Sequence, residues 1–281
     1  MKKYLVDDTE YYVHTAGEGP ILLFAHGFPF DSRLYAEAIE RLKSRFFCVA
    51  PDLRGFGMTP LGANGHNSLG FPRVKMGRYA DDLAILAAEI ACERGTKDAK
   101  IYLCGLSMGG YVALEFARRR PERLAGLIFC DSNATPDAPE KAQSRLDLAD
   151  TINALSIAAL ADGMIPNLVA SSTLEHRRDV VSSLYDMILR QSPQGIAAGS
   201  RGMACRRNLT DLLAQIDVPT LVVGGEFDKL SSASLLDSIA NAIPQGSRAT
   251  IQNAGHVPPL ENPDAFADAI VKWYDSLVVK Q

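Results

Sequence analysis

The segment Lys100–Arg120, KIYLCGLSMGGYVALEFARRR, contains an apolar run, a serine flanked by glycines and a helical pattern, in that order. The run Lys100–Cys104 predicts a strand, and Met108–Arg120 predicts a helix. Between them, Gly105-Leu106-Ser107-Met108-Gly109 fits the pattern G-x-S-x-G, in which the serine occupies a strained strand-to-helix turn. Side chains two residues before and after this serine would collide, so both positions require glycine. The segment therefore predicts a strand–turn–helix unit that exposes the hydroxyl of Ser107.

The same alternation of short apolar runs and longer amphipathic stretches continues along most of the chain. The runs that predict strands are Lys3–Asp7, Tyr11–Thr15, Ile21–Ala25, Phe46–Ala50, Lys100–Cys104, Leu124–Cys130, Thr220–Val223 and Arg248–Gln252. The stretches that predict helices are Ser32–Ser44, Tyr79–Arg94, Met108–Arg120, Ser231–Ala242 and Pro263–Leu277. Several strand runs are apolar at consecutive positions, which indicates strands covered on both faces and hence a mostly parallel sheet. The first two runs predict an antiparallel hairpin at the sheet edge. We therefore predict an α/β doubly wound fold.

The region 133–215 interrupts this alternation, because it contains no convincing strand. It is typical of several helices, broken at Pro136, Pro139, Gly163-Met164-Ile165-Pro166 and Gln191-Ser192-Pro193. We interpret residues 133–215 as a helical cap inserted between two strands of a single core. That core is then formed by residues 1–132 and 216–281.

The composition is that of an ordinary globular protein. Of 281 residues, 47% are hydrophobic and 22% charged, and the formal net charge of −4 gives no indication of binding to nucleic acid or an anionic membrane. No stretch approaches the roughly 18 apolar residues of a membrane helix, and the N-terminus lacks the apolar run of a signal peptide. The five cysteines form no C-x-x-C pair, and Cys48, Cys104 and Cys130 fall in apolar runs that favour buried, reduced thiols. These features predict a cytoplasmic protein and leave its oligomeric state open.

Two more polar residues follow predicted strands, as Ser107 does. Asp228 comes after Thr220–Val223, in Gly224-Gly225-Glu226-Phe227-Asp228, and His256 comes after Arg248–Gln252. In open α/β sheets, sites gather at the carboxyl ends of the strands. A serine hydroxyl needs a base to take its proton and an acid to orient that base, and these three residues occur in the order serine, acid, histidine. We therefore predict Ser107, Asp228 and His256 as a catalytic triad.

The sequence also offers donors for an oxyanion hole and a competitor for the triad acid. One donor is predicted to be the amide of Met108, which follows the nucleophile at a helix N-terminus. The second is predicted to be the amide of Phe28, because Pro29 after it has no N–H. Asp131 ends the strand Leu124–Cys130 and is the alternative acid, although its position also suits a cap for the outgoing chain.

Together these motifs resemble the α/β-hydrolase superfamily over residues 20 to 275, most closely its small carboxylesterases, enol-lactonases, cofactor-free haloperoxidases and C–C hydrolases. The stretches that carry the resemblance are His26-Gly27-Phe28-Pro29, Asp52-Leu53-Arg54-Gly55-Phe56-Gly57, Gly105–Gly110, Gly225-Glu226-Phe227-Asp228 and Gly255-His256-Val257-Pro258-Pro259-Leu260-Glu261. The resemblance implies an eight-stranded, mostly parallel sheet, a helical cap over the site, a Ser-Asp-His triad and no cofactor. Relatives that remove halide or open epoxides carry aspartate where Ser107 stands, and C–C hydrolases of this type often carry asparagine where Leu106 stands.

The predicted function is hydrolysis of small carboxylic esters through an acyl-enzyme, with a lactonase or C–C hydrolase using the same triad as the alternative. A ligand-binding protein on this fold is the non-enzymatic alternative. We expect no metal site, because there is no H-E-x-x-H pattern or Cys/His cluster, and no cofactor. Structural roles are favoured for His26, Asp52 and Arg54, and His66 in the loop 61–71 is considered as a substrate contact.

Overall fold

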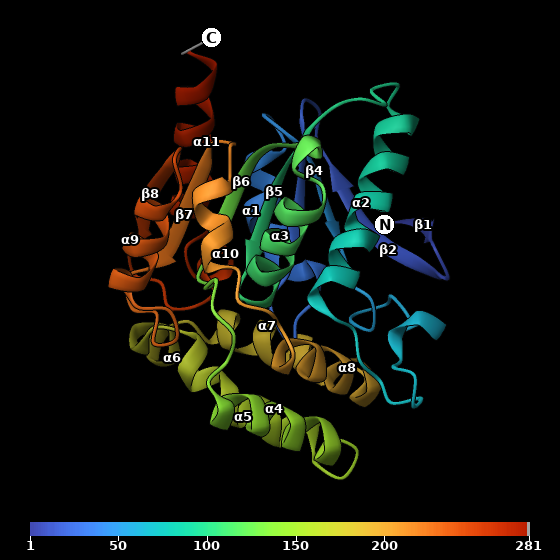
Figure 1. The fold of residues 1–281 in the computed structure, drawn as a ribbon. Coiled ribbons are helices and arrows are strands. Elements are labelled where there is room, and N and C mark those ends of the chain that lie inside the picture. The colour runs from blue at the N-terminus through green and yellow to red at the C-terminus, as the bar shows by residue number, and fades with distance from the viewer. Residues whose placement is uncertain (280–281) are drawn as a thin grey trace.

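Eight strands form one mostly parallel sheet in the computed structural model, which describes residues 1–279 (Figure 1). The strands are β1 (Lys2–Val6), β2 (Thr9–Ala16), β3 (Ile21–Ala25), β4 (Phe47–Pro51), β5 (Ile101–Leu106), β6 (Leu124–Cys130), β7 (Thr220–Gly225) and β8 (Gly246–Ile251). Their spatial order is β1-β2-β4-β3-β5-β6-β7-β8. β1 pairs with β2, and β2 with β4, in antiparallel register, whereas all other neighbours are parallel. The predicted fold class and the antiparallel edge hairpin are confirmed.

Helices cover both faces of the sheet, which explains the consecutive apolar positions. In β3, Leu22 and Phe24 belong to one buried cluster, and Leu23 and Ala25 to the other. Helices α2 (Met76–Glu93), α3 (Met108–Arg119) and α9 (Ala233–Ala242) pack into one cluster, and α1 (Ala36–Leu42) and α11 (Pro263–Val278) into the other. The shorter helices are η1 (Ser32–Tyr35), η2 (Ala63–Gly65), η3 (Pro121–Arg123), η4 (Thr210–Gln215) and α10 (Pro258–Glu261).

Some predicted boundaries differ from the structure for local reasons. The predicted strand Phe46–Ala50 begins one residue later, because the amide of Phe46 donates to the carbonyl of Leu42 and so closes the preceding helical turn. The predicted helix Ser231–Ala242 begins at Ala233, because the hydroxyl of Ser232 accepts from the amide of Leu235 and caps it.

Between β6 and β7 the chain forms five α-helices, followed by η4, and no strand, all within the part that the structure describes. They are α4 (Pro139–Thr151), α5 (Ile157–Leu168), α6 (Ser171–His176), α7 (Arg178–Leu189) and α8 (Pro193–Ala204). Figure 1 shows them gathered at one end of the sheet. α4 packs on α8, and α5 on α7. The carbonyl of Leu168 accepts from the amide of His256, so this end is the one at which the parallel strands have their carboxyl ends.

Two of the prolines in this region lie in the first turn of a helix and do not interrupt one. Pro139 and Pro193 occupy the first turns of α4 and α8, where the missing N–H costs no hydrogen bond. The predicted break at Gly163-Met164-Ile165-Pro166 is wrong, because α5 continues to Leu168. Pro166 removes only one intrahelical donor there, and the helix ends two residues later in any case.

Candidate active site

The turn between β5 and α3 has the strain that the glycine pattern predicts. Ser107 has φ 55° and ψ −113°, outside the regions that a side-chain-bearing residue normally adopts. A Cβ on Gly105 would lie 2.2 Å from the carbonyl oxygen of Gly109, and a Cβ on Gly109 would lie 1.9 Å from that of Ala25. Neither position therefore tolerates a side chain. The Ser107 amide donates to the carbonyl of Cys130 at 3.0 Å, which fixes this turn to the end of β6.

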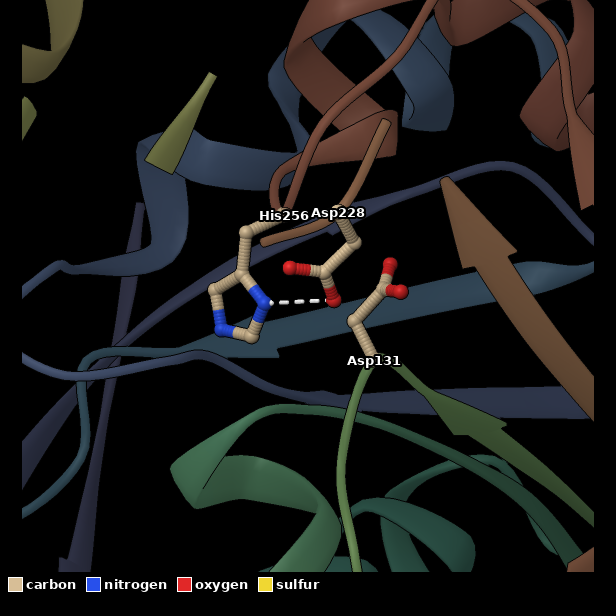
Figure 2. Close-up of side chains that lie close together, drawn as sticks. All are labelled: Asp131, Asp228 and His256. Carbon is tan, nitrogen blue, oxygen red and sulfur yellow. Dashed lines mark hydrogen bonds and ion pairs between the residues drawn. The ribbon is translucent and has the colours of Figure 1, made fainter. Parts of the chain in front are cut away.

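Asp228 and His256 meet although 28 residues separate them in the chain. Nδ1 of His256 lies 2.9 Å from Oδ2 of Asp228, and their side chains are 4% and 1% exposed (Figure 2). Since an ionised carboxylate can only accept, Nδ1 carries the proton and Nε2 is left with a free lone pair. Burial raises the pKa of Asp228, but the contact with His256 and the hydrogen bonds from Asp131 and the amide of Leu230 outweigh it and hold that pKa below its ordinary value. The pair therefore presents an oriented imidazole backed by a carboxylate.

Ser107 and His256 line the same cavity, of about 230 Å³. Its walls also include Tyr111 of α3, Ser231, and residues of α4 and of the segment that precedes it. A larger cavity of about 600 Å³ lies elsewhere, between the start of α2, the end of α3 and the end of α8, and none of the three predicted triad residues lines it. The structure thus brings the predicted nucleophile and base to one small enclosure.

The two backbone amides predicted for the oxyanion hole are without a protein acceptor in residues 1–279. Met108 is the first residue of α3, directly after Ser107, and Phe28 follows β3. Neither amide donates a hydrogen bond within these residues. Both donors are therefore unused by the described chain.

Asp131 lies behind Asp228, which Figure 2 shows between Asp131 and His256. Asp131 is fully buried at φ 42°, and its carboxyl accepts from the amide of Gly225 at 3.1 Å. Burial, and then the neighbouring charge of Asp228, raise the pKa of Asp131 well above its ordinary value. Burial and the charge of Asp228 therefore favour the protonated form of Asp131, and the contact with His256 favours the ionised form of Asp228. The hydrogen bond that Nδ1 of His256 donates is accepted by Asp228 and not by Asp131.

Asp131, Asp228 and His256 are also the one group of potential metal ligands within the described chain, with ligand atoms within 4.8 Å of one another. Their oxygens already face protein donors. Oδ2 of Asp228 accepts from His256, Oδ1 accepts from the amide of Leu230 at 2.8 Å, and the Asp131 carboxyl accepts from Gly225. The geometry is that of a carboxylate orienting an imidazole, and the cluster offers one histidine and two carboxyl groups to any ion.

Glu261 is a further residue of the site that the sequence analysis did not single out. Its side chain is buried, and Oε1 accepts from the amide of Gly255 at 2.7 Å. Oε2 accepts from the amide of Ala170 at 2.9 Å and the hydroxyl of Thr173 at 2.8 Å. Glu261 thus ties the loop before His256 to the segment between α5 and α6. The available signal was an acidic residue five positions after the histidine, in an otherwise apolar stretch.

The other conspicuous polar residues hold loops, as predicted. The amide of Leu53 donates to Nε2 of His26, whose Nδ1 lies 2.9 Å from the carbonyl of Gly27, so His26 is committed to its own loop. Asp52 accepts from the amides of Ser32 and Met58. Arg54 is fully buried and pairs with Asp82 of α2 and with Asp8. His66 lines the 600 Å³ cavity and not the one that contains Ser107.

The comparison with known families agrees with this architecture. A model of the alpha/beta hydrolase family matches residues 22–269. The chain therefore belongs to the alpha/beta hydrolase family. In the part that the structure describes, no helix has the length and apolarity needed to span a membrane.

Several proteins are similar to this chain over nearly their whole lengths. A thermophilic esterase from Thermogutta terrifontis, solved with malate bound, is 36% identical, with a TM-score of 0.90, over 98% of this chain and 99% of that one. A pimeloyl-acyl-carrier-protein methyl ester esterase from Aeromonas hydrophila is 25% identical over 92% of this chain and 96% of its own. An enol-lactonase from Burkholderia xenovorans, 23% identical with a TM-score of 0.83 over 98% of this chain and 100% of that one, shares the fold.

Proposed function

We propose that the chain is a serine hydrolase that cleaves esters of small substrates, lactones included as cyclic esters, through an acyl-enzyme. One observation carries the proposal. The hydrogen bond from Nδ1 of His256 to Asp228 leaves Nε2 as a base at the wall of the cavity that Ser107 also lines. This is the nucleophile, base and orienting acid that acyl transfer requires.

The mechanism follows from these positions. His256 takes the proton of Ser107 while the hydroxyl oxygen of Ser107 attacks the ester carbonyl. Asp228 stabilises the imidazolium that forms. The free amides of Met108 and Phe28 donate to the developing oxyanion. His256 then protonates the leaving alcohol and later activates the water that releases the acid. We also propose that helices α4–α8 are the cap that encloses the substrate, since Pro136, Lys141 and Arg145 line the cavity.

The relatives support an ester as the substrate class. The Thermogutta terrifontis protein is named an esterase, and the Aeromonas hydrophila protein a methyl ester esterase. Each resembles this chain along almost its full length, and both share the family's fold. No cofactor is needed for the proposed steps, because every proton moves between Ser107, His256, substrate and water.

Hydrolysis of p-nitrophenyl acetate tests the proposal. The wild-type chain should turn this ester over, and Ser107→Ala should lower kcat by roughly 10⁴ to 10⁶ while retaining the wild-type circular dichroism spectrum. A ligand-binding protein on the same fold would show no turnover above background. A Ser107→Ala variant that retained a tenth of the activity would refute the proposal.

A further inference from the structure

The cavity that contains Ser107 and His256 is lined by an unusual number of cations for a chain with a net charge of −4. Lys141, Arg145 and Arg206 line it, and one ionised carboxylate, Asp137, lines it with them. The other lining carboxyl group, Asp131, is fully buried and accepts from the amide of Gly225, and burial and the charge of Asp228 raise its pKa. An ester with no charge would gain nothing from this arrangement.

Asp137 neutralises only part of the positive charge of Lys141, Arg145 and Arg206. It pairs with Nε of Arg145 at 2.5 Å and with Nη1 of Arg206 at 2.6 Å, so one carboxylate serves two guanidinium groups. Arg206 is further occupied by the carbonyls of Thr135 and Met203 and by the ring of Tyr111. Arg206 is therefore largely committed to holding the cap.

Arg145 and Lys141 keep free donors. A guanidinium has five N–H donors, and Arg145 uses only Nε, so within residues 1–279 its two terminal nitrogens have no acceptor. No carboxylate of the described chain lies within ion-pair distance of Lys141. Residues 141 and 145 both line the cavity and lie on one face of α4, because positions four apart are neighbours on a helix. Two cations on one face of α4 thus border the enclosure of the nucleophile.

We propose that this cavity selects esters that carry a free carboxylate, bound by Arg145 and Lys141 while the ester carbonyl lies at Ser107. The terminal nitrogens of an arginine match the two oxygens of a carboxylate, and a lysine adds a point charge. The cavity volume of about 230 Å³ fits a small half-ester. This inference rests on the proposed esterase function and names its substrate class.

Two pairs of matched esters test it, each with an anion and a neutral analogue of the same shape. Monomethyl succinate is compared with methyl levulinate, and 3-acetoxypropanoate with 4-acetoxy-2-butanone, so that the carboxylate is placed on either side of the ester. In at least one pair, kcat/KM should be about tenfold or more higher for the anion, the range expected of a charged hydrogen bond. High salt should reduce this preference and leave the neutral ester unaffected.

Variants of Lys141 and Arg145 test whether these two residues cause the preference for anionic esters. Lys141→Met should lower kcat/KM for the preferred anion by about threefold to tenfold, and Arg145→Met should lower it by about tenfold or more. In each variant the ratio of kcat/KM for the anion to kcat/KM for its neutral partner should fall by a similar factor, and the circular dichroism spectrum reports whether the variant is folded. Asp137 keeps its pair with Arg206 when Arg145 is replaced. Lys97→Met, at an exposed lysine outside the cavity, is the matched control and should change neither substrate.

Inhibition of the wild-type protein by a dicarboxylate tests the inference without any variant. Succinate should compete with p-nitrophenyl acetate, and the neutral diamide succinamide should not. Equal kcat/KM values within both ester pairs, together with no inhibition by succinate, would overturn the inference. If Ser107→Ala is inactive at the same time, the proposed esterase function still stands, so the two failures are distinguishable.

Discussion

Replacing the two buried aspartates separately should give very unequal losses, because Asp228 accepts the hydrogen bond of His256 and Asp131 does not, and because their pKa values are shifted in opposite directions. In Asp228→Asn, the amide of Leu230 holds the side-chain oxygen, since it already donates to Oδ1 at 2.8 Å. The NH₂ group then faces Nδ1 of His256 and forces the imidazole proton onto Nε2. In that tautomer His256 cannot accept a proton from Ser107. In serine proteases the same substitution lowers kcat about 10⁴-fold, so we expect a loss of roughly 10³ to 10⁴ here.

Asp131→Asn should cost less than about tenfold in kcat. The carboxyl of Asp131 accepts from the amide of Gly225, and its raised pKa favours the protonated form, which can also donate toward Asp228. An asparagine amide supplies one NH₂ donor and one oxygen acceptor, so it preserves both roles. The assay is kcat on p-nitrophenyl acetate at neutral pH, with circular dichroism as the control for folding. If Asp131→Asn loses more than Asp228→Asn, the acid is Asp131. Similar small losses for both would also refute this reasoning.

The same pair predicts a dependence of stability on pH. The folded-state pKa of Asp131 is raised, so its contribution to stability is fully present below the unfolded value of about 4 and is lost as pH rises toward the folded value. In Asp131→Asn the side chain cannot ionise, so this loss of stability at higher pH does not occur. Its free energy of unfolding should therefore exceed that of the wild type at pH 7, and the excess should shrink as pH falls toward 4. Urea titrations at several pH values measure it, and an excess that grew on acidification would contradict the neutral assignment.

Three further predictions concern the histidine loop, the absence of a metal requirement and the size of the cavity. Glu261→Gln should lower the free energy of unfolding by about 1–3 kcal/mol in urea titrations, because one of three buried donors loses its acceptor, and Thr173→Val should lower it less. Activity should survive EDTA, because His256 takes the proton of Ser107 without a metal ion; loss on chelation with recovery on adding a divalent ion would contradict the proposed mechanism. Acetate and butyrate esters should exceed palmitate esters in kcat/KM, since the cavity holds about 230 Å³, and the opposite order would mean that the cap opens.

The local strain of the elbow and the strand ends could be predicted from the sequence. Gly105 and Gly109 mark the turn because a Cβ atom added at either position would collide with a backbone oxygen. Only glycine fits there, so the residue types alone indicate the turn. Asp228 and His256 follow strands recognisable by apolar runs, and parallel strands bring their carboxyl ends to one edge. These features depend on short-range patterns together with one rule of topology.

The parts that could not be predicted depend on contacts between distant segments. The bonds of Glu261 to Ala170 and Thr173 join positions about ninety residues apart, and nothing near Glu261 in the sequence indicates them. The neutral state of Asp131 depends on complete burial beside a second carboxylate. The continuation of α5 through Pro166 depends on where the helix ends. In each case tertiary packing decides the outcome.

The most direct test of the account is the site of covalent modification by a serine-directed organophosphate. Ser107 and Ser231 line the same cavity, which makes Ser231→Ala a matched control for Ser107→Ala. Intact-protein and peptide mass spectrometry after treatment with diisopropyl fluorophosphate should show one adduct, on the peptide that contains Ser107, in both the wild type and Ser231→Ala. Ser107→Ala should show none. An adduct that persists in Ser107→Ala, or that lies on a different serine of the wild type, would contradict the assignment of Ser107 as the nucleophile.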